Sequence, residues 1–211
     1  MAKQTRRFIP RLEAFDDRCL PSVTFNEVPN GDPMNPNTSW TLQVQGDDGA
    51  NNIAISDDGT ALAGAVAITA DLQATYFSQH TISQIQVFTF GGNDVVDYSL
   101  AGDMVVSRTL SVDLGLKNDT FNAHLGNFVI GGQADVNGLY PAVDFIISVS
   151  GGAGSDRFNV DAANHVNRRA SLAINLVGSK GKDVFTTNYS VTTDPADGLN
   201  PAGFFLPSQT Q

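Results

Sequence analysis

The 211-residue sequence has a single cysteine, Cys19, and only 12 basic residues against 22 acidic ones. One cysteine excludes an intramolecular disulfide framework and a zinc site built on cysteines. The net charge of −10 argues against nucleic-acid binding, which selects basic surfaces. No apolar run reaches the length of a membrane span. Arginine and aspartate also interrupt every apolar stretch in residues 1–18, so no standard signal peptide is expected.

Glutamate is scarce as well, because only Glu13 and Glu27 are glutamates and the other acidic residues are aspartates. Aspartate, asparagine and glycine favour turns and helix ends over helix interiors. The composition therefore predicts many turns and few helices. Aspartate oxygens suit calcium, and an aspartate-rich surface also keeps a β-protein soluble, so both interpretations stay open.

The stretch Gly151–Asn159 matches the nonapeptide G-G-x-G-x-D-x-U-x, in which U is a large apolar residue. With its aspartate as position zero, apolar residues occupy positions −9, −7 and +2, and glycine occupies position −2. The apolar offsets recur at four further places, and the glycine recurs at three of those. The zero positions are Asn51, Asp94, Asp119, Asp156 and Asp183. Chance is a poor explanation in a chain that is 41% hydrophobic.

Each copy is a strand–turn–strand unit. Two apolar residues two apart make one face of a strand, and the Gly/Asn/Asp cluster turns the chain. Such a unit cannot bury its apolar face alone, so stacked units must share a core. The expected core includes Leu110, Val112, Phe121, Ile147, Val149, Phe158, Ile174, Leu176 and Phe185.

The pattern predicts an all-β fold, namely a short parallel β-helix or β-roll-like solenoid, with the zero positions in a ladder along one edge. A β-sandwich is the alternative, because strand–turn–strand units also build hairpins.

We expect three parts along the chain. Residues 1–37 are interpreted as a basic, sorting-like N-terminal segment and a linker, 38–190 as the solenoid domain, and 191–211 as a disordered tail. Trp40 opens the first strand and is interpreted as a core or end-capping aromatic. Extra short strands are expected at 65–69, 76–77 and 128–130, and a side loop at 161–169.

The five turns resemble the hemolysin-type (RTX) calcium-binding repeat, although only Gly151–Asn159 matches the full motif. In that family the nonapeptides run in tandem, and calcium lies between successive turns, held by aspartate carboxylates and turn carbonyls. The resemblance implies calcium as cofactor. The ligands it implies are Asp94, Asp119, Asp156 and Asp183, with oxygens from Gly92, Gly152, Gly154 and Gly181.

Several residues depart from that family. The turns are 25 to 43 residues apart, so sites can form only if the turns of neighbouring repeats stack. Asn51 replaces the acid of the first copy, and Lys117, Lys180 and Lys182 place cations inside two turns. The alternative is that the aspartates only hydrogen-bond turn amides.

Residues 11–22 read Arg-Leu-Glu-Ala-Phe-Asp-Asp-Arg-Cys-Leu-Pro-Ser. They resemble the R-L-E-x-L-E-D-R-x-x-P-S opening of many large surface or exported proteins of planctomycete-type bacteria, with Phe15 and Asp16 in place of Leu-Glu. The resemblance implies an extracellular or cell-surface location. A short exposed basic helix is the alternative interpretation.

No catalytic constellation is recognisable, and the three histidines lack metal-ligand spacing. The one local mixture of acids and bases comprises Asp161, His165, Arg168 and Arg169. We therefore expect a non-enzymatic structural or adhesive module whose partner is a cell-surface or matrix component. A polysaccharide-active β-helix enzyme is the alternative. A flat face rich in Thr, Asn and Ser would favour adhesion, and a groove with convergent titratable groups would favour the enzyme.

Overall fold

The computed structural model describes residues 23–71 and 73–194 with their side chains, and residues 203–205 and 209–210 as backbone. These residues form strands and turns without a helix, so the fold is all-β, as predicted. None of them forms a helix that could cross a membrane. The motif at residues 11–22 lies outside the described residues.

The described strands form three sheets. Sheet 1 contains, in spatial order, β1 (Thr24–Pro29), β2 (Trp40–Gln45), β6 (Ile82–Phe88), β8 (Arg108–Asp113), β11 (Val143–Ser150), β14 (Ala170–Val177) and β17 (Gly203–Phe205), and β18 (Gln209–Thr210) also pairs with β14. All neighbours from β2 to β18 run parallel, whereas β1 is antiparallel to β2.

Sheet 2 faces sheet 1 across the core. Its order is β15 (Val184–Tyr189), β12 (Arg157–Ala162), β9 (Thr120–Gly126), β7 (Val95–Leu100), β3 (Asn52–Asp57), β4 (Val66–Ala70) and β5 (Tyr76–Phe77). The strands from β15 to β3 run parallel, and β4 and β5 add antiparallel pairs at the N-terminal end. Sheet 3 is short and parallel, with β10 (Val129–Ile130), β13 (His165–Val166) and β16 (Thr192–Thr193).

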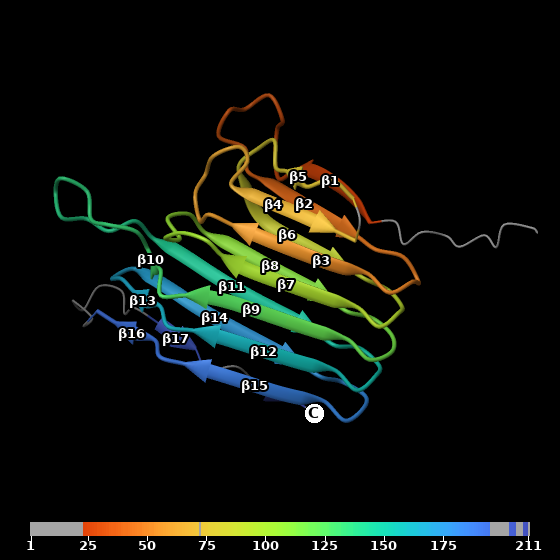
Figure 1. Ribbon diagram of the computed structural model, residues 1–211. Coiled ribbons are helices and arrows are strands. Elements are labelled where there is room, and N and C mark those ends of the chain that lie inside the picture. The colour runs from red at the N-terminus through yellow and green to blue at the C-terminus, as the bar shows by residue number, and fades with distance from the viewer. Residues whose placement is uncertain (1–22, 72, 195–202, 206–208, 211) are drawn as a thin grey trace, which may run out of the picture.

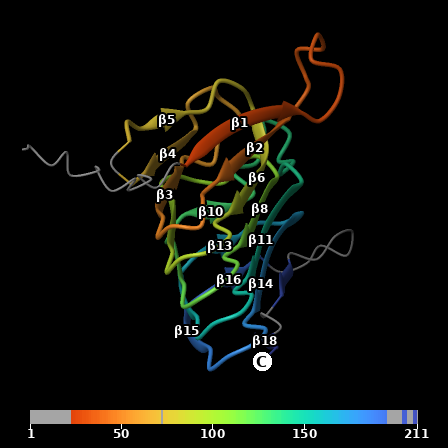
Figure 2. The same cartoon turned by 90° about the vertical axis from the view of Figure 1, so that its right-hand side faces the viewer.

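The chain passes repeatedly from a strand of sheet 1, through a turn, to a strand of sheet 2. Each further passage adds one strand to each sheet beside the previous one. Figure 1 shows these turns along one side of the domain, with β10, β13 and β16 on the other side. Figure 2 shows β1, β4 and β5 at the N-terminal end. Repeats distant in sequence therefore bring equivalent residues side by side.

The apolar offsets form the core. Fourteen of these fifteen side chains are buried, including the three of the Gly151–Asn159 copy. In sheet 1, Ile147 lies in register between Leu110 and Ile174. The exception is Phe185, which is half-buried and stacks on Phe158 with ring centroids 4.8 Å apart. The predicted core is thus confirmed, and its last member lies at the C-terminal end of the stack.

Three segments differ from the predicted boundaries. β1 lies within residues 1–37, which were expected to be segment and linker, because its alternating side chains cover the first repeat. β16, β17 and β18 lie within the expected tail 191–211. Residues 161–169, expected to be a side loop, include the end of β12 and the strand β13. The extra strands expected at 65–69, 76–77 and 128–130 are confirmed as β4, β5 and β10, with small shifts of their ends.

A charged cluster lies inside the core, on the side away from the turns. The side chains of Arg108 and Asp57 are fully buried. Arg108 donates to both Asp57 carboxylate oxygens, with Nε–Oδ2 of 2.8 Å and Nη2–Oδ1 of 3.1 Å. The buried Tyr98 hydroxyl donates to the same carboxylate at 3.0 Å. This bidentate pair fixes β3, β7 and β8 relative to one another.

Candidate functional site

The turns between sheets 1 and 2 stack directly on one another. Parallel bridges join one residue of each turn to the next, in the order Gly91, Leu116, Ala153 and Lys180. Backbone hydrogen bonds continue this stack, with Ala153 N donating to Gly115 O at 2.9 Å and Lys180 N donating to Gly152 O at 3.1 Å. The turns therefore line up along one edge of the domain, as the predicted ladder requires.

The zero positions form a continuous hydrogen-bonded ladder along this edge. The backbone N–H of Asn51 donates to Oδ1 of Asp94 at 2.7 Å, and that of Asp94 donates to Oδ1 of Asp119 at 2.8 Å. The N–H of Asp119 donates to Oδ1 of Asp156, and that of Asp156 to Oδ1 of Asp183, both at 2.9 Å. We call these five residues the Asp ladder. Each carboxylate satisfies a backbone amide of the preceding repeat, so the predicted ladder is confirmed.

Glycines next to the Asp ladder give it room. A Cβ on Gly151 would lie 2.3 Å from Oδ2 of Asp156, five residues later, and the glycine five residues before Asp183 is equally close to that carboxylate. At position −2, a Cβ on Gly154 would lie 1.5 Å from the carbonyl oxygen of Lys117. Lys117 itself takes the glycine position with a φ of 85°. The recurring glycine thus reflects the close approach of neighbouring turns.

Burial governs the electrostatics of the Asp ladder. Asp94, Asp119 and Asp156 are at most 1% exposed, and burial raises the pKa of all three. The pKa of Asp119 is raised to about 7, first by burial and further by the charges of Asp94 and Asp156, against the lowering effect of its hydrogen bond from Asp94. The Oδ2 atoms of Asp119 and Asp156 are buried without a hydrogen-bond partner among the described residues. These carboxyls therefore favour the protonated form more than ordinary aspartates do.

Several of the oxygens that the calcium prediction relies on already accept hydrogen bonds within the turns. Calcium takes about 6–8 oxygen ligands. Oδ1 of each ladder aspartate accepts a backbone amide, and the carbonyl of Gly152 accepts the amide of Lys180. Within the part of the chain that the structure describes, no three His, Cys, Asp or Glu side chains group closely enough to hold a metal. Calcium at this edge stays a prediction, to be tested by chelation.

The acidic and basic residues that the enzyme alternative would use, at 161–169, make separate contacts. Asp161 lies on β12 and points to the outer face of sheet 2, where it accepts an amide of the neighbouring strand. His165 contacts Asp194 with Nε2–Oδ1 of 3.3 Å. Arg169 donates to a loop carbonyl at 3.1 Å, and only the backbone of Arg168 approaches Asp194. These groups do not converge on one point.

A second cluster, which the sequence did not reveal, lies at the N-terminal end. The Glu27 side chain is only 6% exposed and accepts three hydrogen bonds. The donors are the Tyr76 hydroxyl at 2.6 Å, the Gln79 amide at 2.7 Å and His80 Nδ1 at 2.5 Å. The His80 ring stacks on Trp40 with centroids 3.7 Å apart and planes 14° apart. Burial and then Glu27 raise the pKa of Tyr76 above its ordinary value.

A pocket of about 250 Å³ adjoins this cluster. Its walls are Trp40, side chains of the loop 33–38, Ala63 and residues 79–81. His80 is the only titratable side chain among the described residues that form these walls. The partners come from segments about 50 residues apart, so no local motif could have indicated them.

No protein-family model matches this sequence, and no curated protein or solved structure matches it either.

Proposed function

We propose that the domain is a short parallel β-helix that serves as a non-enzymatic structural or adhesive module at a bacterial cell surface. The parallel pairing of the repeat strands in all three sheets supports the β-helix. The turns stacked along one edge support it too, since a sandwich built from hairpins would pair each strand with its chain neighbour. The location follows only from the resemblance of residues 11–22.

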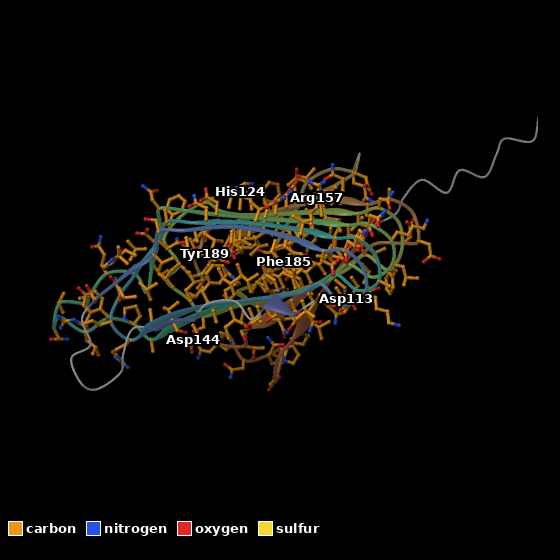
Figure 3. All side chains as sticks on the ribbon, turned by 90° about the horizontal axis from the view of Figure 1, so that it is seen from below. Asp113, His124, Asp144, Arg157, Phe185 and Tyr189 are labelled. Atoms are coloured by element: carbon orange, nitrogen blue, oxygen red, sulfur yellow. The ribbon has the colours of Figure 1, made fainter. Side chains whose placement is uncertain are left out.

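The proposal for adhesion rests on the outer face of sheet 2. Figure 3 shows His124 and Arg157 on this face, Asp113 and Asp144 on the opposite outer face, and Phe185 and Tyr189 between the sheets. Two aligned rows cross the outer face of sheet 2, namely Ala54–Asp97–Asn122–Asn159–Thr186 and Ser56–Ser99–His124–Asp161–Asn188. Side-chain amides link neighbouring strands, with Asn159 Nδ2 donating to Asn122 Oδ1 at 2.7 Å. A regular polar face of this kind can contact an extended partner at many points.

The enzyme alternative lacks an equivalent observation in the described residues. A shallow hollow over sheet 1 contains Asp113 as its only titratable side chain. In the pocket at the N-terminal end, His80 is the only titratable side chain among the described lining residues. Both oxygens of the nearby Glu27 already accept hydrogen bonds. General acid–base chemistry on a glycosidic bond ordinarily uses two positioned carboxyl groups.

Co-sedimentation with insoluble cell-wall polysaccharides tests the function. Purified domain should pellet with the polysaccharide, and no new reducing ends should appear in the supernatant. Release of reducing ends would establish the enzyme alternative. Absence of pelleting with every polysaccharide and with intact bacterial envelopes would refute adhesion.

Calcium stabilisation is a separate part of the proposal. Calcium that binds only the folded form raises the free energy of unfolding by about 2.7 kcal/mol at a hundredfold excess over Kd. The domain should then melt at a higher temperature in millimolar calcium than in chelator, and Asp156→Ala should remove most of that difference. Identical melting curves in calcium and in chelator would show that hydrogen bonds alone, without calcium, hold the Asp ladder together.

A further inference from the structure

We propose that the pocket beside Trp40 binds one neutral pyranose residue of a surface or matrix polysaccharide. This assignment rests on the proposed adhesive role and names the chemistry of the partner. It concerns the N-terminal end of the domain, on a different surface from the polar rows of sheet 2.

The size of the pocket restricts the ligand to a small group. Its volume of about 250 Å³ is below the roughly 300–1,000 Å³ of pockets that take drug-sized ligands. A single sugar ring suits such a space, with the rest of the chain outside. A monosaccharide in so small a site should bind with a Kd on the order of 1 mM.

One wall of the pocket is a rigid aromatic surface. The indole of Trp40 is half-buried and covered on one side by the parallel His80 ring. Glu27 fixes that ring through Nδ1, and Glu27 is itself held by Tyr76. The part of this stacked pair that lines the pocket offers an aromatic surface to the C–H groups of a pyranose, and a wall ordered in advance lowers the entropy cost of binding.

The remaining walls carry polar groups suited to hydroxyls. Because the Glu27 carboxylate accepts from Nδ1 of His80, Nδ1 carries the hydrogen and Nε2 is left for a ligand. Gln79 uses Nε2 on the carbonyl of Phe77, which leaves Oε1 as an acceptor. The Asn35 amide and the Thr38 hydroxyl of the loop 33–38 complete the polar lining.

Charge decides between sugar classes. Among the described residues, no Asp, Glu, Lys or Arg lines the pocket, so it offers no permanently charged partner to a carboxylate or an amino group. The net charge of −10 further disfavours an anionic sugar. The geometry therefore favours a neutral ring over a uronic acid or an amino sugar with a free amine.

The experiment uses Trp40 as its own reporter, because it is the only tryptophan in the chain. Its fluorescence is followed while glucose, galactose or N-acetylglucosamine is added, with glucuronic acid as the charged comparison. At least one neutral sugar should give a saturable change with a Kd on the order of 1 mM. Glucuronic acid should bind at least about tenfold more weakly.

Two variants and a control make the test specific. Gln79→Ala removes the exposed acceptor and retains the backbone amide that Glu27 uses. His80→Phe retains a ring that can stack on Trp40, and it removes Nε2 together with the Nδ1 contact to Glu27. Each should weaken sugar binding at least about fivefold, from loss of a ligand hydrogen bond. Phe90→Ala, at the edge that carries the Asp ladder, should titrate like wild type. Circular dichroism melts check that every variant folds.

Two results would overturn the assignment. One is no saturable response to any of the three neutral sugars, and the other is unchanged binding in both pocket variants. A domain that pellets with polysaccharide but shows no Trp40 response overturns this pocket alone and leaves the adhesive role standing. Failure of both measurements overturns both proposals.

Discussion

Replacing Asp119 with asparagine should change how the stability of this domain depends on pH. Asparagine keeps an Oδ1 that can accept the amide of Asp94, now 2.8 Å from the carboxylate. It places a neutral NH₂ where Oδ2 now lies buried without a partner among the described residues. The substitution thus removes the titration with little change in shape.

The sign of the effect follows from the direction of the shift. The pKa of Asp119 is about 7 in the folded protein, against about 3.9 for an unfolded aspartate. Between these values the folded state binds more protons, so its contribution to stability falls as pH rises from 4 to 7. Three pKa units correspond to about 4 kcal/mol at most. Because part of the shift comes from the charges of Asp94 and Asp156, which titrate together with Asp119, we expect roughly 1–2 kcal/mol from this residue alone.

Urea unfolding at a series of pH values between 4.5 and 7.5 measures this contribution. The free energy of unfolding of wild type relative to Asp119→Asn should fall by roughly 1–2 kcal/mol across the range. Asp113→Asn, on the exposed end of β8, is the matched control and should follow wild type. Backbone amides lower the pKa of Asp135, so its protonation affects stability only below about pH 4, outside the range of this experiment. Parallel pH profiles for wild type and Asp119→Asn would refute the reasoning.

Three further predictions concern stability. Phe158→Ala should lower the free energy of unfolding by about 3–5 kcal/mol, since Phe158 is fully buried, and a loss below about 1 kcal/mol in urea unfolding would show that the core register is wrong. Arg108→Ala should lower the free energy of unfolding by about 3–5 kcal/mol, because it leaves the buried Asp57 carboxylate without its cation. The double variant with Asp57→Asn should recover part of that loss, and a double variant no more stable than Arg108→Ala would contradict the ion-pair argument. Gly154→Ala should lower the free energy of unfolding by roughly 1–3 kcal/mol or more, because the new Cβ would meet a carbonyl of the neighbouring turn. Gly31→Ala is the control and should lower it far less, since the nearest atom to its Cβ would be 3.8 Å away, and equal melting temperatures for the two variants would exclude the close turn contact.

The repeating part of the fold could be predicted because its signal is periodic. The offsets around Asp156 identify which residues face inward, and burial of Phe158 and Ile147 follows from strand alternation alone. The alignment of zero positions followed from the same register. The hydrogen-bond partner of each aspartate could not be predicted, because it is a backbone amide that lies 25 to 43 residues earlier in the chain. A backbone amide leaves no signal in the sequence.

The ends of the fold were harder to predict than its middle. Prolines and asparagines near β1 suggested a linker, but alternating Phe25, Glu27 and Pro29 cover the first repeat. The cluster around Glu27 joins segments about 50 residues apart, so no spacing indicated it. The role of Trp40 was predicted only as a core or end-capping aromatic, since stacking on His80 depends on tertiary contacts.

The antiparallel strands β1, β4 and β5 reverse polarity at the N-terminal end of an otherwise parallel stack. A parallel repeat cannot be inserted outside them without loss of their pairing, whereas one inserted between existing repeats meets matching neighbours on both sides. Tandem duplication of the 27-residue unit from residue 157 to 183 would add one strand to each large sheet and one carboxylate to the Asp ladder. At about 4.8 Å per strand, the length of the molecule can therefore change in discrete steps during evolution, while the pocket at its N-terminal end stays the same.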